Sequence, residues 1–189
     1  MDNISKIGLG TVQWGTPYGI SNNQGITNLS EVKRILDISE SKKINLIDTA
    51  SLYGDSEIKL GNFNLLNFRV VTKTSKFDAK VITSEEILKL EKTFKKSLKN
   101  LNLIKIHGLL IHNADDLLKK GGELIVHKLN DFKEKGLVKK IGVSIYDYRI
   151  MEKVLKVFTP DIVQLPLNVF DQESYLSGAL GFWKTKNIE

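Results

Sequence analysis

The chain has 189 residues, of which 41% are hydrophobic and 26% are charged, and its formal net charge is +6. This length suits one domain of ordinary size, and the composition is globular. The absence of cysteine excludes a disulfide framework and a cysteine-ligated metal site. No apolar run approaches the roughly 20 residues of a membrane-spanning helix, and the N-terminus lacks the apolar core of a signal peptide. We therefore expect a soluble, cytoplasmic protein without a membrane partner.

The positive charge does not indicate binding to nucleic acid. Most of it comes from lysines that are spread along the chain, and arginine occurs only at positions 34, 69 and 149. In residues 83–101, apolar side chains recur every three or four positions and the lysines fall largely elsewhere. The apolar positions are Ile87, Leu90, Phe94, Leu98 and Leu101. A solvated helix face explains such lysines, and the sequence contains no nucleic-acid-binding motif.

Short apolar segments alternate with longer helical patterns along the chain. Strands are expected at residues 6–10, 44–48, 68–73, 105–111, 139–143 and 161–165, most of which are rich in Ile, Val and Leu. Helices are expected at residues 30–42, 55–66, 83–100, 123–135, 148–157 and 173–186. This alternation predicts a parallel sheet with helical crossovers, in a single domain that spans residues 1–189.

Local signals mark several helix ends. Ser30 and Ser56 are the expected N-caps of two helices. The segment from Thr83 to Glu86 fits a capping box. Gly136 follows a helical pattern and is expected just beyond the end of that helix.

Two architectures fit alternating strands and helices: an open doubly wound sheet and a closed (β/α)8 barrel. The open sheet often carries a G-x-G-x-x-G pattern after its first strand. Here Gly8 and Gly10 fit the start of that pattern, but Gln13 stands at the third glycine position. The sequence therefore favours the barrel, in which functional residues gather at the C-terminal ends of several strands.

Polar residues stand at the ends of the expected strands. Asp48 ends the second strand, and Tyr53 lies in the loop that follows. The next four strands end at or beside Lys73, His112, Ser144 and Gln164. Each residue alone has an ordinary structural explanation, such as a turn cap or a solvated lysine. Because the C-terminal ends of barrel strands open on one face, the residues together predict a catalytic site.

These side chains suit the chemistry of carbonyl groups. A phenol has an ordinary pKa of about 10, and a nearby ammonium group lowers that pKa by favouring phenolate. Lys73 would supply this charge to Tyr53, and Asp48 would hold Lys73 in place. His112 would orient a carbonyl oxygen or help Tyr53 to donate its proton. None of these groups donates hydride, so a nicotinamide cofactor would have to supply it.

The segment "NLIDTASLYGDSEIKLG", residues 45–61, resembles the second-strand signature of the aldo-keto reductase family. That signature has Asp-Thr-Ala followed by Tyr-Gly and Ser-Glu. The segments "VVTK", "LLIH", "IGVS" and "DIVQLPLNVFD" resemble later strand ends of the family, in the family's order. The segment "LGTVQWG" resembles its first strand and glycine-rich turn. The resemblance runs from about residue 6 to residue 189.

The resemblance implies a (β/α)8 TIM barrel that reduces an aldehyde or ketone to an alcohol, or runs the reverse oxidation. The substrate would be a small carbonyl or sugar-like compound, the cofactor NADP(H) or NAD(H), and no metal is implied. The implied catalytic tetrad is Asp48, Tyr53, Lys73 and His112. Tyr53 would be the general acid. The implied cofactor contacts are Gly10, Thr11, Ser144 and Gln164. Trp14 would line the substrate pocket, whereas the position of Glu57 in a first helical turn already explains that residue.

Two features depart from the family pattern. Ile145 follows the serine of "GVS", where family members often carry an asparagine that contacts the nicotinamide carboxamide. About six strand–helix units are recognisable, whereas a (β/α)8 barrel typically needs about 250 residues. We therefore expect a C-terminally truncated, incomplete barrel that lacks strands seven and eight. Its open edges, at residues 6–10 and 161–165, would leave unpaired backbone groups and favour self-association.

Two alternatives to a carbonyl reductase stay open. A truncated chain with this fold would be a non-catalytic remnant or a cofactor-sensing binding subunit. A Schiff-base aldolase would use Lys73 as its nucleophile, although the signature that contains Asp48 and Tyr53 argues against it. The sequence identifies neither the substrate nor the preference between NADP and NAD, because the implied determinants of both include the two units that are not recognisable here.

Overall fold

The computed structural model describes residues 6–189, which contain one six-stranded sheet. Its strands are β1 (Gly8–Gly10), β2 (Leu46–Asp48), β3 (Arg69–Lys73), β4 (Ile106–Ile111), β5 (Val138–Ser144) and β6 (Ile162–Gln164). They follow chain order across the sheet, and the pairs β1–β2, β2–β3 and β5–β6 are parallel. This is the partial (β/α)8 arrangement that the sequence predicts.

Eight α-helices connect or follow the strands within the described residues. They are α1 (Val12–Gly15), α2 (Leu29–Ser41), α3 (Ser56–Leu60), α4 (Ser84–Asn100), α5 (Glu123–Glu134), α6 (Met151–Val157), α7 (Glu173–Leu176) and α8 (Ala179–Thr185). Short 3-10 helices occupy Ala114–Leu118 (η2) and Tyr148–Ile150 (η3). The sequence did not predict α1, and the helix expected at 173–186 is divided into α7 and α8.

The helix expected at 55–66 ends early, at Leu60. The next residue, Gly61, lies so close to the end of α4 that a Cβ atom there would be 2.0 Å from the carbonyl oxygen of Asn100. Side-chain periodicity does not record this approach between backbones. The chain that leaves α3 at Gly61 therefore packs directly against the end of α4, a contact that a local sequence pattern does not record.

Two of the expected helix caps are wrong and one is confirmed. Asn28, rather than Ser30, caps α2, because its side chain accepts a hydrogen bond from the Glu31 N–H at 2.9 Å. The N-cap position of α3 is Asp55, and Ser56 is the first residue inside the helix. Gly136 has φ +69° just beyond α5, as expected for a glycine that ends a helix.

The chain divides into two compact units. The first comprises Met1–Thr74 and Lys92–His107, of which residues 1–5 lie outside the described part, and the second comprises Ser75–Glu91 and Gly108–Glu189. The expectation of a single domain is not tested by this division and stays a prediction. Each unit has its own buried apolar residues.

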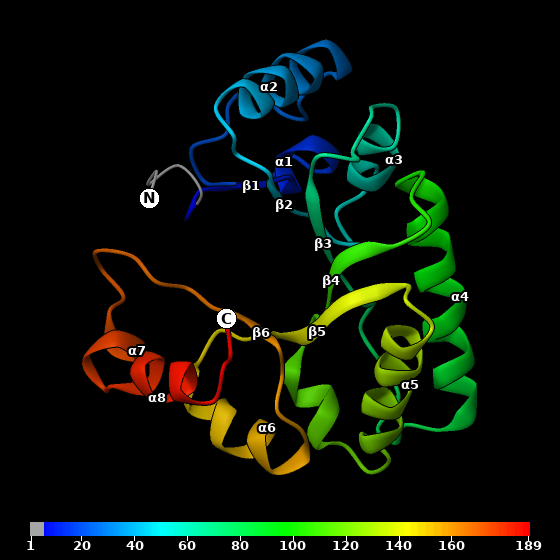
Figure 1. Cartoon of the computed structure of the whole chain (residues 1–189), viewed down its shortest axis with the longest axis vertical. Helices are drawn as coiled ribbons and strands as arrows, with labels where there is room; N and C mark the ends of the chain where they lie inside the picture. Colours follow the sequence, from blue (N-terminus) through cyan, green and yellow to red (C-terminus); the bar gives the residue numbers. More distant parts are fainter. Residues whose placement is uncertain (1–5) are drawn as a thin grey trace. The chain divides into compact units, whose positions relative to one another are not determined.

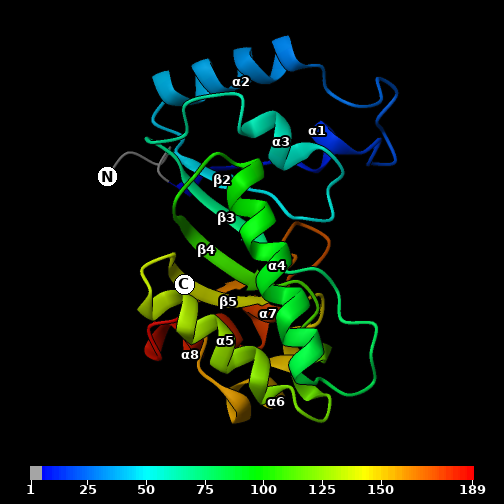
Figure 2. The same cartoon turned by 90° about the vertical axis from the view of Figure 1, so that its right-hand side faces the viewer.

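The first unit packs helices onto β2 and β3. In the sheet Ile47 is paired with Val70, and both are almost fully buried. The apolar side of α2 contributes Val32 and Leu36, which are also buried. Figures 1 and 2 show α2 and α3 on the same side of these strands. The unit thus fixes the C-terminal ends of β2 and β3 from which the site residues emerge.

The second unit packs α5 and α6 on the strands around β5. Leu129 of α5, Val143 of β5 and Val154 of α6 are fully buried, and Figures 1 and 2 place both helices on one side of β5. Gly142 permits the close approach of β6, since a Cβ atom there would lie 1.9 Å from the carbonyl oxygen of Ile162. These contacts fix the ends of β5 and β6.

The outer edge of β6 is partly paired, which differs from the open edge that the sequence predicts. The Val163 N–H donates to the carbonyl oxygen of Glu189 at 2.7 Å, and the Glu189 N–H donates to that of Asp161 at 3.0 Å. This alternation is the bonding pattern of neighbouring parallel strands. Glu189 therefore satisfies two backbone groups that would otherwise be exposed at this edge.

None of the helices in residues 6–189 is long and apolar enough to cross a bilayer. The same residues contain no group of three or more His, Asp or Glu side chains placed to hold a metal ion.

Candidate active site in the first unit and predicted cofactor contacts in the second

The ends of β2 and β3 bring an acid and an amine into contact. Asp48 is the last residue of β2 and is paired with Val71, so Lys73 lies just beyond it at the end of β3. The Lys73 Nζ atom donates to Asp48 Oδ1 at 2.6 Å. Only 2% of the Lys73 side chain is exposed, against 25% of the Asp48 side chain. Asp48 therefore neutralises a buried ammonium group, as predicted from the order of the strands.

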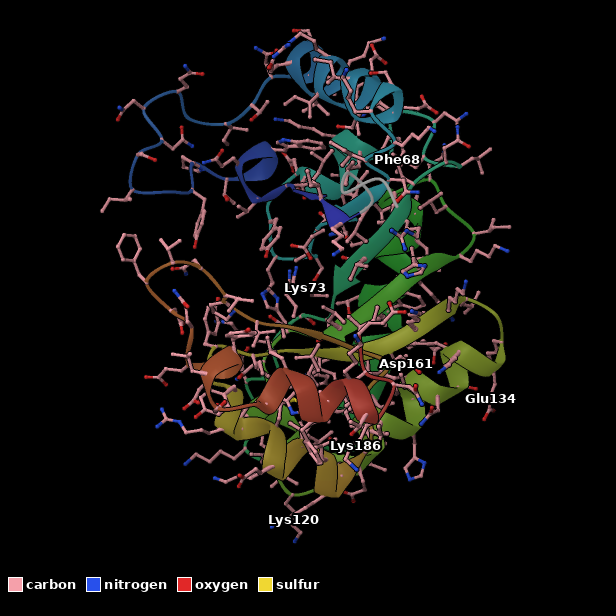
Figure 3. The ribbon with its side chains drawn as sticks, turned by 60° about the vertical axis from the view of Figure 1, so that its left-hand side comes forward. Phe68, Lys73, Lys120, Glu134, Asp161 and Lys186 are labelled. Atoms are coloured by element: carbon pink, nitrogen blue, oxygen red, sulfur yellow. The ribbon has the colours of Figure 1, made fainter. Side chains whose placement is uncertain are left out.

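Tyr53 lies beside this ion pair. Two turns of the loop after β2 place the residue: the Tyr53 N–H donates to the carbonyl oxygen of Ala50, and the Ser56 N–H donates to that of Tyr53, both at 3.0 Å. Lys73 Nζ lies 4.9 Å from the centroid of the Tyr53 ring, within the range of a cation–π contact. Asp48, Tyr53 and Lys73 thus converge within one unit, and Figure 3 shows Lys73 at the end of β3.

The environment of Lys73 has two opposing effects on its charge. Burial lowers the pKa of Lys73 from its ordinary value of 10.5, and the contact with Asp48 acts in the opposite direction. The net direction is downward, because burial is the larger effect. The ammonium group is therefore held in place by Asp48 while burial makes its proton easier to lose.

Backbone groups of the first unit support the amine further. Lys73 Nζ also donates to the carbonyl oxygen of Thr49 at 3.0 Å. The Ser51 hydroxyl donates to the carbonyl oxygen of Lys73 at 3.1 Å, and the Thr49 N–H donates to that of Val71 at 2.9 Å. The loop after β2 therefore forms three hydrogen bonds with the end of β3.

Close contact between Gly15 and Gly54 fixes the loop that carries Tyr53. A Cβ atom on Gly15 would lie 1.7 Å from the carbonyl oxygen of Tyr53, and one on Gly54 would lie 2.2 Å from that of Gly15. Gly54 also has φ +53°, which glycine adopts more readily than residues with a side chain. Only a pair of glycines lets α1 reach the Tyr53 loop this closely. Sequence reasoning missed the pair, although both glycines stand in the segments that resemble the family.

A cluster of buried hydroxyl groups underlies the same loop. The Ser56 hydroxyl donates toward Thr11 Oγ1 at 2.7 Å and lies 3.2 Å from the Thr49 hydroxyl. Thr11 Oγ1 in turn donates to the carbonyl oxygen of Asp48 at 3.0 Å. All three side chains are fully buried. The cluster ties the ends of β1 and β2 to the start of α3 and gives Thr11 a structural role, so a cofactor contact by its side chain stays a prediction.

Glu57 is buried in the first turn of α3 rather than solvated there. Its exposed fraction is 3%, and its Oε1 atom accepts a hydrogen bond from the Thr72 hydroxyl at 2.7 Å. The contact joins α3 to β3 one residue before Lys73. Glu57 therefore has a structural partner that its position in the helix alone did not reveal.

Two further predicted residues of the first unit differ in exposure. Gly10, at the end of β1, is exposed, and a Cβ atom there would have no neighbour within 4 Å. A cofactor would therefore have open space beside this backbone. Trp14 is only 4% exposed, so its part in a substrate pocket stays a prediction.

The other predicted residues belong to the second unit. His112 follows β4 and is half-buried, and its place beside Tyr53 stays a prediction. Ser144 ends β5 opposite Gln164 at the end of β6, and both side chains are half-buried. The buried Gln164 Oε1 atom has no hydrogen-bond partner within residues 6–189. The residue after Ser144, Ile145, is buried and donates its N–H to the Gln164 carbonyl oxygen at 2.8 Å.

The fold and the site point to the same class of protein. Parallel strand–helix units, with an acid, a phenol and an amine after β2 and β3, match part of a (β/α)8-barrel enzyme. The chain belongs to the aldo/keto reductase family, whose family model matches residues 6–188.

Solved structures agree with this assignment. PA4992 of Pseudomonas aeruginosa, whose description places it among the aldo-keto reductases, is 26% identical with a TM-score of 0.75, over 96% of this chain and 70% of that one. An aldo-keto reductase from Bacillus halodurans is 18% identical with a TM-score of 0.74, over 97% of this chain and 59% of that one. Glycerol dehydrogenase from Gluconobacter oxydans is 23% identical with a TM-score of 0.73, over 100% of this chain and 59% of that one.

The last two structures show likeness of fold alone, because their sequence identity is low. The chain spans 59% to 70% of the length of these three proteins. A search of curated proteins finds no match.

Proposed function

We propose that the protein reduces an aldehyde or ketone to an alcohol with NADP(H) or NAD(H), or runs the reverse oxidation. The observation that carries this proposal is the buried Lys73 ammonium, which bonds Asp48 and lies against the ring of Tyr53. A positive charge beside a phenol favours the phenolate and so eases release of the phenolic proton. This is what a general acid needs in order to protonate a carbonyl oxygen near neutral pH.

Each side chain has a distinct part in the proposed reaction. Tyr53 donates its proton to the carbonyl oxygen during reduction and accepts it back during oxidation. Lys73 stabilises the phenolate that remains, and Asp48 keeps Lys73 charged and oriented. His112 of the second unit is proposed to hold the carbonyl oxygen toward Tyr53.

The residues of the second unit fit a nicotinamide cofactor. A buried amide oxygen without a partner, such as Gln164 Oε1, can accept a hydrogen bond from the carboxamide of a nicotinamide. Ser144 ends the neighbouring strand and is proposed to contact the same group. Ile145 has no polar side-chain atom, and its N–H donates to the Gln164 carbonyl oxygen, so the side chain at this position cannot replace the carboxamide contact of an asparagine. Bound, the cofactor supplies the hydride that no side chain of the site can supply.

The surroundings of Lys73 do not favour the aldolase alternative. A Schiff base requires an amine that is accessible and neutral. Lys73 is 2% exposed, and its Nζ atom bonds both Asp48 and the Thr49 carbonyl oxygen. The first unit therefore fits a positioning role for Lys73 better than a nucleophilic one.

Two measurements on the full chain test the proposal. A fluorescence titration with NADPH measures cofactor binding, and turnover is followed with a panel of small aldehydes, ketones and sugars. Glycerol serves for the reverse direction, because a neighbour of the same fold bears the name glycerol dehydrogenase. We expect Tyr53→Phe to lower turnover by about 10² to 10⁴-fold while leaving NADPH binding within about twofold.

Tyr175→Phe is the matched control, since Tyr175 is an exposed phenol on α7. We expect it to retain wild-type turnover. Equal turnover of Tyr53→Phe and wild type would remove Tyr53 as the general acid. NADPH binding without turnover on any substrate would favour the cofactor-sensing alternative.

A further inference from the structure

A cavity of about 400 Å³ lies in the second unit, apart from the residues of the proposed reaction. It lies among the loop after β5, the segment after β6 and the start of α7. Its lining includes Tyr146, Asp147, Tyr148, Phe170, Asp171 and Glu173, together with Arg149 and Ser174. Phe170 and Asp171 stand in the segment "DIVQLPLNVFD", but no role was assigned to them from the sequence, and none of the lining residues belongs to the predicted tetrad.

Ser174 gives this cavity a polar group that needs a partner. Its exposed fraction is 3%, and its Oγ atom is buried without a hydrogen bond to any residue in the described part of the chain. A buried hydroxyl without a partner carries a desolvation penalty that no hydrogen bond offsets. Because a serine hydroxyl both donates and accepts and can rotate, a ligand in the cavity could satisfy it.

The charge of the cavity favours a cation. Asp147 is already neutralised by Arg149, whose Nε atom donates to its carboxylate at 2.8 Å. Asp171 and Glu173 form no ion pair within residues 6–189, although Arg149 is close enough to Glu173 for a weak electrostatic effect. Three carboxylates against one guanidinium leave the cavity with an excess of negative charge.

The aromatic side chains point to the same kind of ligand. Tyr146, Tyr148 and Phe170 line the cavity, and Tyr146 and Phe170 are largely exposed. Aromatic faces attract cations, and carboxylates nearby add to that attraction.

A neighbouring cavity lacks these features. It measures about 410 Å³, lies between α6 and α8, and has Glu152 as its only acidic residue and no unpartnered buried polar atom within the described residues.

We propose that the cavity beside Ser174 binds a small organic cation that carries N–H groups, such as a primary ammonium or guanidinium compound. The carboxylates of Asp171 and Glu173 attract its charge, the aromatic rings cover its apolar part, and its N–H groups donate to Ser174 Oγ. A quaternary ammonium ion would bind more weakly, because it has no N–H group for the serine. This binding activity is additional to the proposed carbonyl chemistry.

Calorimetric titration of the full chain with agmatine tests the proposal. We expect saturable binding that weakens as salt is added. Ser174→Ala should weaken agmatine binding about tenfold, which corresponds to loss of a hydrogen bond to a charged group. Asp171→Asn and Glu173→Gln should each weaken it about threefold to tenfold, whereas Glu134→Gln, on exposed α5 surface, should leave it unchanged.

Thermal unfolding separates ligand binding from a purely structural role. Removal of an unpartnered buried hydroxyl should leave the stability of the free protein unchanged or raise it, so Ser174→Ala should fold at least as well as wild type. Tetramethylammonium should bind to wild type more weakly than agmatine does. It should bind to Ser174→Ala as tightly as it binds to wild type. No saturable binding at millimolar agmatine, or equal affinity of wild type, Ser174→Ala and Asp171→Asn, would overturn the proposal. Neither result depends on turnover of a carbonyl substrate.

Discussion

At the scale of single residues, the surroundings of Lys73 are the main support for the proposed chemistry. Its ammonium group is buried, bonded to Asp48 and to the Thr49 carbonyl oxygen, and placed against the ring of Tyr53. A buried charge is stable only when it is paired and hydrogen-bonded, and both conditions are met here. The sequence predicted the pairing of Asp48 with Lys73, because consecutive parallel strands place their ends side by side. It did not reveal the Thr49 contact, since a backbone carbonyl has no signature of its own.

Lys73→Met tests the tuning role of the amine. The variant keeps an unbranched side chain but removes the charge beside Tyr53, so the phenolic proton is harder to release. We expect turnover to fall by about 10²-fold or more while NADPH binding, measured by fluorescence, changes little. Lys80→Met, on an exposed lysine, is the control and should retain turnover. A Lys73→Met protein that is folded and as active as wild type would contradict the role.

Lys73 also predicts a pH dependence of stability. Its pKa is lowered in the folded protein, chiefly by burial, so between that lowered pKa and 10.5 the unfolded chain binds more protons than the folded one. Stability rises with pH wherever this holds. The cost of the buried charge is therefore fully present below the folded pKa and is relieved as pH rises toward 10.5.

Urea unfolding of wild type and Lys73→Met measures this effect. Between about pH 7 and about pH 10, the difference in unfolding free energy should shift in favour of wild type as pH rises. The comparison removes the titration of all other groups that the two proteins share. A difference that moves the other way would mean that the contact with Asp48 outweighs burial.

At the scale of the elements, the position of Tyr53 depends on how closely α1 approaches the loop after β2. Gly15 and Gly54 allow that approach, and the hydroxyl cluster of Thr11, Thr49 and Ser56 fixes the strands beneath it. The sequence predicted Ser56 to be a helix cap, yet its hydroxyl donates a hydrogen bond to Thr11, next to the end of β1. Its partner Thr11 lies 45 positions away in the chain, a separation that no helix or strand period can express.

Gly54→Ala should destabilise the protein far more than Gly25→Ala. Both glycines have positive φ, so both substitutions carry a conformational cost of about 1 kcal/mol. Only at Gly54 would the new methyl group collide with a backbone atom, the Gly15 carbonyl oxygen, whereas Gly25 has open space. We expect a loss of roughly 3 kcal/mol or more for Gly54→Ala, measured by urea unfolding. Similar losses for the two variants would refute the close contact.

Ser56→Ala is a milder test of the same region. It removes a hydroxyl that bonds Thr11 and lies beside Thr49, and it leaves those buried groups less satisfied. We expect a loss of about 1–3 kcal/mol in unfolding free energy. Ser30→Ala is the control, because Ser30 is exposed and Asn28 caps its helix, and it should change stability by less than about 0.5 kcal/mol.

At the scale of the whole molecule, exposed apolar residues and sheet edges bear on association. β1 has a strand partner on one side in the sheet, and Ile7, just before it, is 51% exposed. The edge of β6 is less open than expected, because Glu189 bonds part of it. We therefore expect any self-association to depend more on the β1 edge than on the β6 edge.

Sedimentation at increasing protein concentration tests this expectation. Ile7→Lys places a charge beside the edge of β1 and should weaken self-association about tenfold, whereas Leu66→Lys, at an exposed loop position, should not. If both variants associate as strongly as wild type, the β1 edge is not the contact surface.

The sequence by itself determined the alternation of strands and helices, the parallel order of the strands, and the residue types at their ends. These features follow from local burial patterns, which a period of two or of three to four residues records directly. Only the tertiary structure decided the contact of Gly61 with the end of α4, the contact of Gly15 with Gly54, the partner of Glu57 and the cavity beside Ser174. Each of these features arises where segments distant in sequence approach one another. Such contacts do not produce a repeating pattern of residues, so a local sequence pattern does not reveal them.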